Sequence, residues 1–133
     1  MRVIIAHSGV SRIMNEEKCN KRIKTSQNAV KNGIKAKECV EAVEKTVNFL
    51  ENSATVNAGL GSVSQKDGVK RMDASIMRGS DLEYGAVCSL RNVQNPISVA
   101  RLIMETPDGH NMYAHDFATK LAKEKGITFI KEE

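Results

Sequence analysis

The chain has 133 residues, of which 41% are hydrophobic and 27% charged, and its formal net charge is +4. These values are ordinary for a globular protein, and the length suits a single domain over residues 1–133. No apolar run is long enough to span a membrane, and the apolar stretch after Arg2 is too short for a secretory signal peptide. Three cysteines, far apart and odd in number, favour reduced thiols in the cytoplasm over a disulfide framework.

Much of the positive charge lies in the first third of the chain. One interpretation is a nucleic-acid surface, and the other is the solvated face of a helix. We favour the helix face and expect neither nucleic acid nor a membrane as partner, because no aromatic residue that could stack on a base interleaves the charges. The basic residues are Lys18, Lys21, Arg22, Lys24, Lys31, Lys35 and Lys37.

The first half of the chain predicts one strand and two helices. Residues 3–7 (VIIAH) are apolar and β-branched, which predicts a buried strand. A helix is expected from residue 15 to about residue 32, with Gly33 as its stop signal. Apolar residues at helical spacing then indicate a second helix. They are Val40, Val43, Val47 and Leu50, with Ala36 extending the stripe.

The second half predicts mixed strands and helices. Residues 61–65 and 69–76 alternate in polarity and are joined by Lys-Asp-Gly, a hairpin signal, while residues 78–80 mark another turn. Residues 84–90 predict a strand, and Pro96 begins a helix over residues 96–105. A short strand at residues 110–114 and a helix closed by Gly126 complete the chain. Strands in a run, flanked by helices, indicate an α+β layered domain.

The sequence TVNAGLGS, residues 55–62, places Gly59 and Gly61 close to Asn57. Glycine permits positive φ and the close approach of another backbone, and the Asn carboxamide both donates and accepts hydrogen bonds. Such a junction can bring Asn57 and several backbone groups near a bound atom. The alternative is an ordinary turn in which Asn57 caps the local backbone.

Two histidines allow a second site hypothesis. His110 and His115, with Asp108 and Asp116 nearby, could bind a metal. However, a spacing of five residues does not place them on one helical face, and no third ligand is fixed. We therefore favour surface histidines.

Four separated sequence blocks occur in a fixed order: VNAGLGS, MDASIM, GAV after Leu82, and NPIS followed by AR and ME. Together they resemble the α chain of the plant-type L-asparaginases and isoaspartyl aminopeptidases, which are N-terminal-nucleophile threonine hydrolases. The resemblance extends from residue 3 to residue 127. It implies an αββα sandwich that is incomplete without a β-chain portion. It also implies hydrolysis of L-asparagine, of β-aspartyl (isoaspartyl) dipeptides, or of both.

The resemblance places the nucleophile outside this sequence. In the family it is a threonine exposed by autoproteolysis in a Gly-Thr-Val type motif, and none of the threonines here has that context. The implied partner is a β chain from the same or a homologous precursor, assembled with this chain into a hetero-oligomer. The alternative is a truncated, inactive relative that at most binds a partner chain.

The resemblance also implies site residues. Asn57 would lie beside the nucleophile and support it, and His7, Ser8 and Gly9 would form the loop near the cleavage site. Ser8 stands where the family has a glycine. No cofactor is implied for the chemistry, but a structural sodium ion is. Its ligands would be the main-chain carbonyls of Leu50, Glu51, Ser53, Val56, Ala58 and Leu60.

Overall fold

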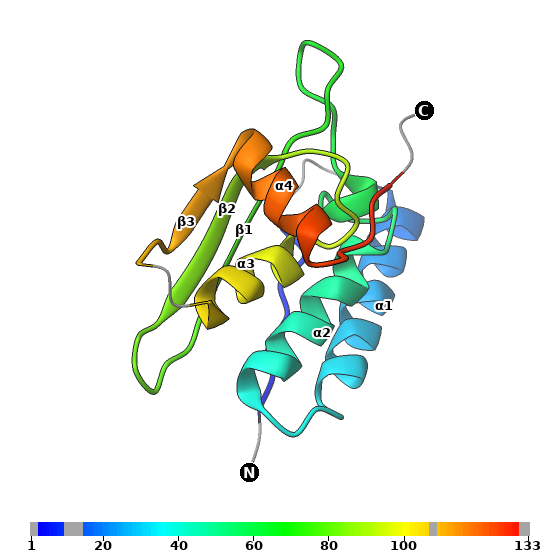
Figure 1. Ribbon diagram of the computed structural model, residues 1–133. Helices are drawn as coiled ribbons and strands as arrows, with labels where there is room; N and C mark the ends of the chain where they lie inside the picture. The colour runs from blue at the N-terminus through cyan, green and yellow to red at the C-terminus, as the bar shows by residue number, and fades with distance from the viewer. Residues whose placement is uncertain (1–2, 10–14, 107–108, 131–133) are drawn as a thin grey trace. The chain divides into compact units, whose positions relative to one another are not determined.

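The computed structural model describes residues 3–9, 15–106 and 109–130 (Figure 1). The chain divides into two compact units, Met1–Gly61 and Ser62–Glu133. The single domain expected from the length stays a prediction. Among the described residues, no helix is both long and apolar enough to cross a membrane.

The first unit is built on a pair of helices, α1 (Glu16–Gly33) and α2 (Cys39–Glu51), which pack against each other. Both lie where the sequence pattern predicts them. The side chain of Asn15 caps α1 by accepting a hydrogen bond from the Lys18 N–H at 3.0 Å. Gly33 is the last residue of α1, as expected, but it also has a packing role, since a Cβ there would overlap the Thr46 side chain of α2.

The buried strand predicted at residues 3–7 is wrong. Residues 3–9 form no regular secondary structure, and Val3 and Ile5 are 70% and 88% exposed. A strand exists through hydrogen bonds to a neighbouring strand, and no described residue pairs with this segment. An apolar, β-branched sequence can therefore indicate a strand without supplying the neighbour that the strand needs.

The apolar stripe of α2 is only partly buried. Leu50 is buried in a small core with Ala29 and Val56, whereas Val43 is 45% exposed. Thr46, a polar residue, is buried because it faces Gly33. The helical period was therefore predicted correctly, but the buried residues of the helix include two polar ones, Thr46 and Glu51.

The second unit contains a three-stranded sheet with the order β1 (Met72–Met77), β2 (Tyr84–Leu90), β3 (Met112–Ala114). β1 and β2 are antiparallel, and β2 and β3 are parallel, with α3 (Pro96–Glu105) between them in the sequence. The predictions for residues 84–90 and 96–105 are confirmed, and β3 lies within the predicted residues 110–114.

The predicted hairpin around Lys-Asp-Gly is correct only in its turn. The Gln65 N–H donates to the Val69 carbonyl at 3.0 Å, and Gly68 has φ +80°. Residues 61–65 form no strand, however, and β1 begins only at Met72. The hydrophobic residue of that first segment, Val63, is 70% exposed, so little burial favours a strand there.

The buried face of the sheet is formed by cross-strand pairs. Met72, Ala74 and Ile76 of β1 pair with Leu90, Val87 and Gly85 of β2. α3 covers this face with Ile97, Ala100, Ile103 and Met104. Gly85 permits this packing, because a Cβ there would overlap the Ala100 carbonyl.

A bulge interrupts β2 between the Val87 and Leu90 pairs, where β1 has one residue and β2 has two. Ser89 adopts φ +55°, and its N–H donates to the Asp73 carboxylate at 2.7 Å. The extra residue changes the phase of side-chain alternation, so Val87 and Leu90 are both buried although they are three positions apart.

The second unit ends with α4 (His115–Glu124), which buries Ala118 and Ala122. Gly126, at φ +71°, terminates it as predicted, and its N–H donates to the Lys123 carbonyl at 3.1 Å. The described residues thus contain four α-helices and one three-stranded sheet, and the α+β class is confirmed. The two-sheet sandwich stays a prediction.

Candidate functional site

The candidate site is the loop of residues 52–61, which begins at the end of α2 and includes the short 3-10 helix η1 (Gly59–Gly61). α2 ends where the Asn52 N–H donates to the carbonyls of Asn48 and Leu50. The Ser53 N–H also donates to the Leu50 carbonyl, at 3.0 Å. These bonds turn the chain away from the helix axis and begin the loop.

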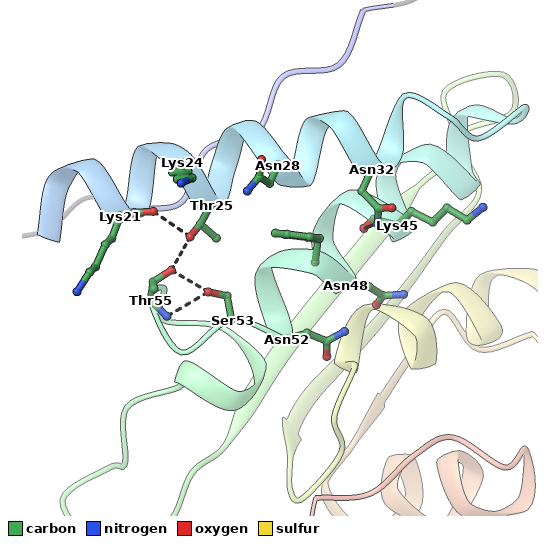
Figure 2. A pocket seen from close by; sticks show the side chains of 11 residues that line it. Lys21, Lys24, Thr25, Asn28, Asn32, Lys45, Asn48, Asn52, Ser53 and Thr55 are labelled. Atoms are coloured by element: carbon green, nitrogen blue, oxygen red, sulfur yellow. Dashed lines mark hydrogen bonds between the residues drawn. The ribbon is translucent and has the colours of Figure 1, made fainter. Parts of the chain in front are cut away.

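A chain of hydroxyl groups ties the loop to α1. The Thr55 hydroxyl lies 2.8 Å from that of Ser53 and 2.9 Å from that of Thr25 on α1. The Arg22 side chain, also on α1, donates to the Thr55 carbonyl at 3.0 Å. Figure 2 shows the three hydroxyls in a line, with Thr25 in turn donating to the Lys21 carbonyl at 2.9 Å.

Val56 packs the loop against the small hydrophobic core of the first unit. It is 4% exposed and packs with Ala29 and Leu50, with Phe49 and Ala58 beside them. The next residue, Asn57, is exposed. The loop therefore holds Asn57 at the surface, between the buried Val56 and the helical turn η1 that begins at Gly59.

The two glycines of the loop allow backbone carbonyls to crowd together. Gly59 has φ +51°, and a Cβ there would overlap the Glu51 carbonyl oxygen. A Cβ on Gly61 would overlap the Val56 carbonyl oxygen and lie 2.9 Å from that of Ser53. Only glycine fits at these two positions, which explains their spacing in the sequence.

The sodium site stays a prediction. The Glu51 carbonyl lies against Gly59, and the carbonyls of Ser53 and Val56 lie against Gly61. Those of Leu50, Val56 and Ala58 accept loop N–H groups at 2.9–3.0 Å. Each carbonyl oxygen has two lone pairs, so it can accept an N–H and still face a cation. Oxygen donors of this kind suit a hard cation.

The burial of one side chain beside this loop, that of Glu51 at the end of α2, was not predicted from the sequence. Glu51 was named for its carbonyl, yet its side chain is also buried, since the residue is 3% exposed. The Glu51 Cβ lies 2.6 Å from where a Cβ of Gly59 would be. A polar residue that ends an amphipathic helix is normally exposed, so no local sequence signal could have indicated its burial.

His7, Ser8 and Gly9 precede α1. The Gly9 N–H donates to Nδ1 of His7 at 3.2 Å, which makes that nitrogen an acceptor. Gly9 has φ +85° with open space around it, so backbone conformation requires glycine here. The loop continues at Val10 and Ser11, outside the described residues, and the position of this loop relative to a cleavage site stays a prediction.

His110 and His115 are both exposed, as expected for surface histidines. His115 Nδ1 lies 2.8 Å from the Asp116 carboxylate, and His110 packs edge-on against Tyr113. In the described part of the chain, no three His, Cys, Asp or Glu side chains are placed to bind a metal. Asp108, the fourth residue of the metal hypothesis, lies outside that part.

A groove of about 720 Å³ lies between α1 and α2, beside the loop (Figure 2). We call it the α1–α2 groove. It is lined by lysines (Lys21, Lys24, Lys45), asparagines (Asn28, Asn32, Asn48, Asn52), hydroxyl residues (Thr25, Ser53, Thr55) and Phe49. The basic side chains of α1 are exposed, as predicted, except that Arg22 is half-buried where it bonds to Thr55.

A family model for asparaginases matches residues 1–133. The chain belongs to the asparaginase family. It is 43% identical over 130 residues to the plant-type L-asparaginase of Pyrococcus furiosus, covering 96% of this chain and 42% of that protein. It is 38% identical over 135 residues to the isoaspartyl peptidase/L-asparaginase of Xenopus laevis, covering 98% and 43%. The asparaginase-family chain thus spans less than half the length of these relatives.

Proposed function

We propose that this chain is the α-chain portion of an amidohydrolase that cleaves L-asparagine, β-aspartyl dipeptides or both. Its nucleophile would be the N-terminal threonine of a β chain, released by autoproteolysis. The observation that carries the proposal is the match of the whole chain to the asparaginase family, with relatives named for both activities. The free α-amino group of that N-terminal threonine would act as the base.

Asn57 would support this nucleophile. Its carboxamide is exposed beside the buried Val56, and the hydroxyl chain through Thr55 holds the loop to α1. A rigid loop that presents one polar side chain can aim a hydrogen bond at the threonine hydroxyl or at the developing oxyanion. Such a group stabilises charge without reorganising during the reaction.

A sodium ion would stabilise the same loop. The carbonyls gathered at Gly59 and Gly61 would hold it, and the ion would offset their mutual repulsion. It would perform no chemistry. Its role would be to fix the backbone that positions Asn57.

Two features of the fold support a β-chain partner and a sandwich. Met77, Tyr84 and Met112 lie on the sheet with 61%, 47% and 55% exposure, which leaves apolar surface open to a second layer. Residues 3–6 are apolar and have no strand partner among the described residues. We therefore expect the isolated chain to associate or aggregate. A monomer at high concentration that melts cooperatively above about 60 °C would contradict this.

The test is reconstitution. The purified chain should release no ammonia from L-asparagine and no aspartate from β-aspartyl-leucine, whereas the chain combined with the β chain of a homologous precursor should release one or both. Activity of the chain alone, lost on mutation of one of its own residues, would contradict the proposal. Inactivity of the reconstituted complex, once its assembly is shown by size-exclusion chromatography, would favour the alternative of an inactive binding partner.

A further inference from the structure

The α1–α2 groove lies beside the loop that carries Asn57, and its lining has an unusual chemistry. Three lysines and four asparagines line it, and no acidic side chain does. We propose that this groove binds an extended, acidic peptide segment of a partner protein. The asparagines contact the main chain of the peptide, and the lysines pair with its carboxylates. This proposal does not depend on the amidohydrolase function.

The shape of the groove suits an extended chain. Along α1 its lining residues recur at helical spacing, from Lys21 through Thr25 and Asn28 to Asn32. The eleven helical steps from Lys21 to Asn32 extend about 16 Å at about 1.5 Å each. An extended peptide advances about 3.3 Å per residue, so the groove accommodates about five residues. Figure 2 shows Asn48 on α2 and Asn52 just after its end, across from this line of side chains.

The asparagines favour a peptide over a nucleic acid as the ligand of the groove. A carboxamide carries both a donor and an acceptor, which match the C=O and N–H of one peptide unit. A phosphate backbone offers acceptors only, so the oxygen of each carboxamide would face another oxygen. Asn28, in the middle of the line, is half-buried, and its side chain makes no hydrogen bond within the described residues. Its carboxamide is therefore available to a ligand.

The lysines can exchange their present partners. Lys21 pairs with Glu17 at 2.7 Å and Lys45 with Glu41 at 2.6 Å, each across one helical turn. The first pair is exposed and the second is about half-exposed, and ion pairs open to solvent in this way are weak. Lys24 makes no ion pair with a described residue. Carboxylates of a bound peptide can thus recruit all three ammonium groups without breaking a strong interaction.

Hydrogen bonds between side chains hold one end of the groove in place. The hydroxyls of Ser53, Thr55 and Thr25 form a hydrogen-bonded chain there, and Phe49 adds a half-buried apolar surface. Because the side chains at this end are held before a peptide binds, they lose little conformational freedom on binding, and this favours affinity.

The experiment measures the fluorescence anisotropy of a labelled heptapeptide of alternating glutamate and serine at low ionic strength. The peptide is added to the full 133-residue chain, taken from the fraction that size-exclusion chromatography shows to be free of aggregate. We expect saturable binding. Asn28→Leu should raise the dissociation constant about tenfold, and Lys24→Gln about threefold. The matched controls, Gln27→Leu on another face of α1 and Lys35→Gln beyond its end, should bind as the wild type does. Circular dichroism checks that each variant keeps its helix content.

A second arm uses only the wild-type protein, so it decides even if a variant fails to fold. The same peptide with alternate main-chain nitrogens methylated keeps its charge but loses donors, and it should bind about tenfold more weakly. If the methylated peptide binds as tightly as the unmodified peptide, the groove recognises only the charge of the ligand, and the proposal is overturned. Absence of saturable binding, or tighter binding of a thymidine octanucleotide, would also overturn it.

Discussion

The hydroxyl of Thr46 occupies the position that a Cβ on Gly33 would need, and this single contact sets how closely α1 and α2 approach. The hydroxyl is held there by a hydrogen bond to the Ala42 carbonyl at 2.7 Å. That carbonyl oxygen itself lies 2.6 Å from the Cβ position. The Ala42 carbonyl is part of the backbone of α2, so it cannot move without shifting the helix.

Gly33→Ala should therefore lower the free energy of unfolding, by about 1–3 kcal/mol, because the added methyl overpacks the helix pair. Helix propensity alone predicts the opposite sign, a gain of up to about 1 kcal/mol. Urea unfolding measures the difference. Gly79→Ala is the control, since Gly79 has open space around it and should change by less than about 0.5 kcal/mol. A Gly33→Ala variant as stable as the wild type would show that the helices can separate freely.

Asn57→Ala should reduce kcat of the reconstituted enzyme by about 10²–10³, the effect of removing one positioned hydrogen-bond donor. Its melting temperature should hardly change, because Asn57 is exposed. Steady-state assays of ammonia release measure the effect, and Asn20→Ala on α1 is the control. Wild-type turnover in Asn57→Ala would remove this residue from the site.

Replacing sodium by N-methyl-glucamine at equal ionic strength should lower the melting temperature, because a ligand that binds only the folded state stabilises it by mass action. At 100 times the dissociation constant the stabilisation is about 2.7 kcal/mol. Gly61→Ala should abolish the dependence on sodium, since its methyl overlaps the Val56 carbonyl. Identical melting curves in the two salts would argue against the ion.

The turn between β1 and β2 should weaken in acid. The Glu83 backbone N–H and then Arg78 hold the pKa of Asp81 below its ordinary value of 3.8. Because the pKa is lowered in the folded state, the stabilisation is complete above about pH 4 and is lost as the pH falls through the folded-state pKa. Asp81→Asn should flatten the acid limb of the stability profile measured by urea unfolding. An unchanged slope would show that Asp81 does not contribute.

The sequence predicted elements whose signals are local. Pro96 fixed the start of α3, and the β-branched and small residues of positions 84–90 indicated β2. Gly126 was recognised as a stop because its role is conformational, and the structure confirms its positive φ.

Features that depend on distant contacts were not predictable in the same way. The missing strand at residues 3–7 requires a neighbour that no local pattern reveals. Gly33 was identified as a helix stop, but its contact with Thr46 depends on how two helices meet. The burial of Glu51 depends on the return of the chain at Gly59. In the candidate loop, composition indicated a special backbone, whereas the carbonyls it brings together emerged only from the fold.

The bulge at Ser89 links the number of residues in β2 to the face on which Leu90 lies. The same sequence without the bulge would turn Leu90, now fully buried, towards the opposite face of the sheet, whereas deleting Ser89 would leave Val87 and Leu90 two positions apart and on the same face. Conservative substitutions at Cys88, which is half-buried, would leave this phase intact. Drift in this strand should therefore proceed by replacement, and the bulge should be lost only together with one residue of β2.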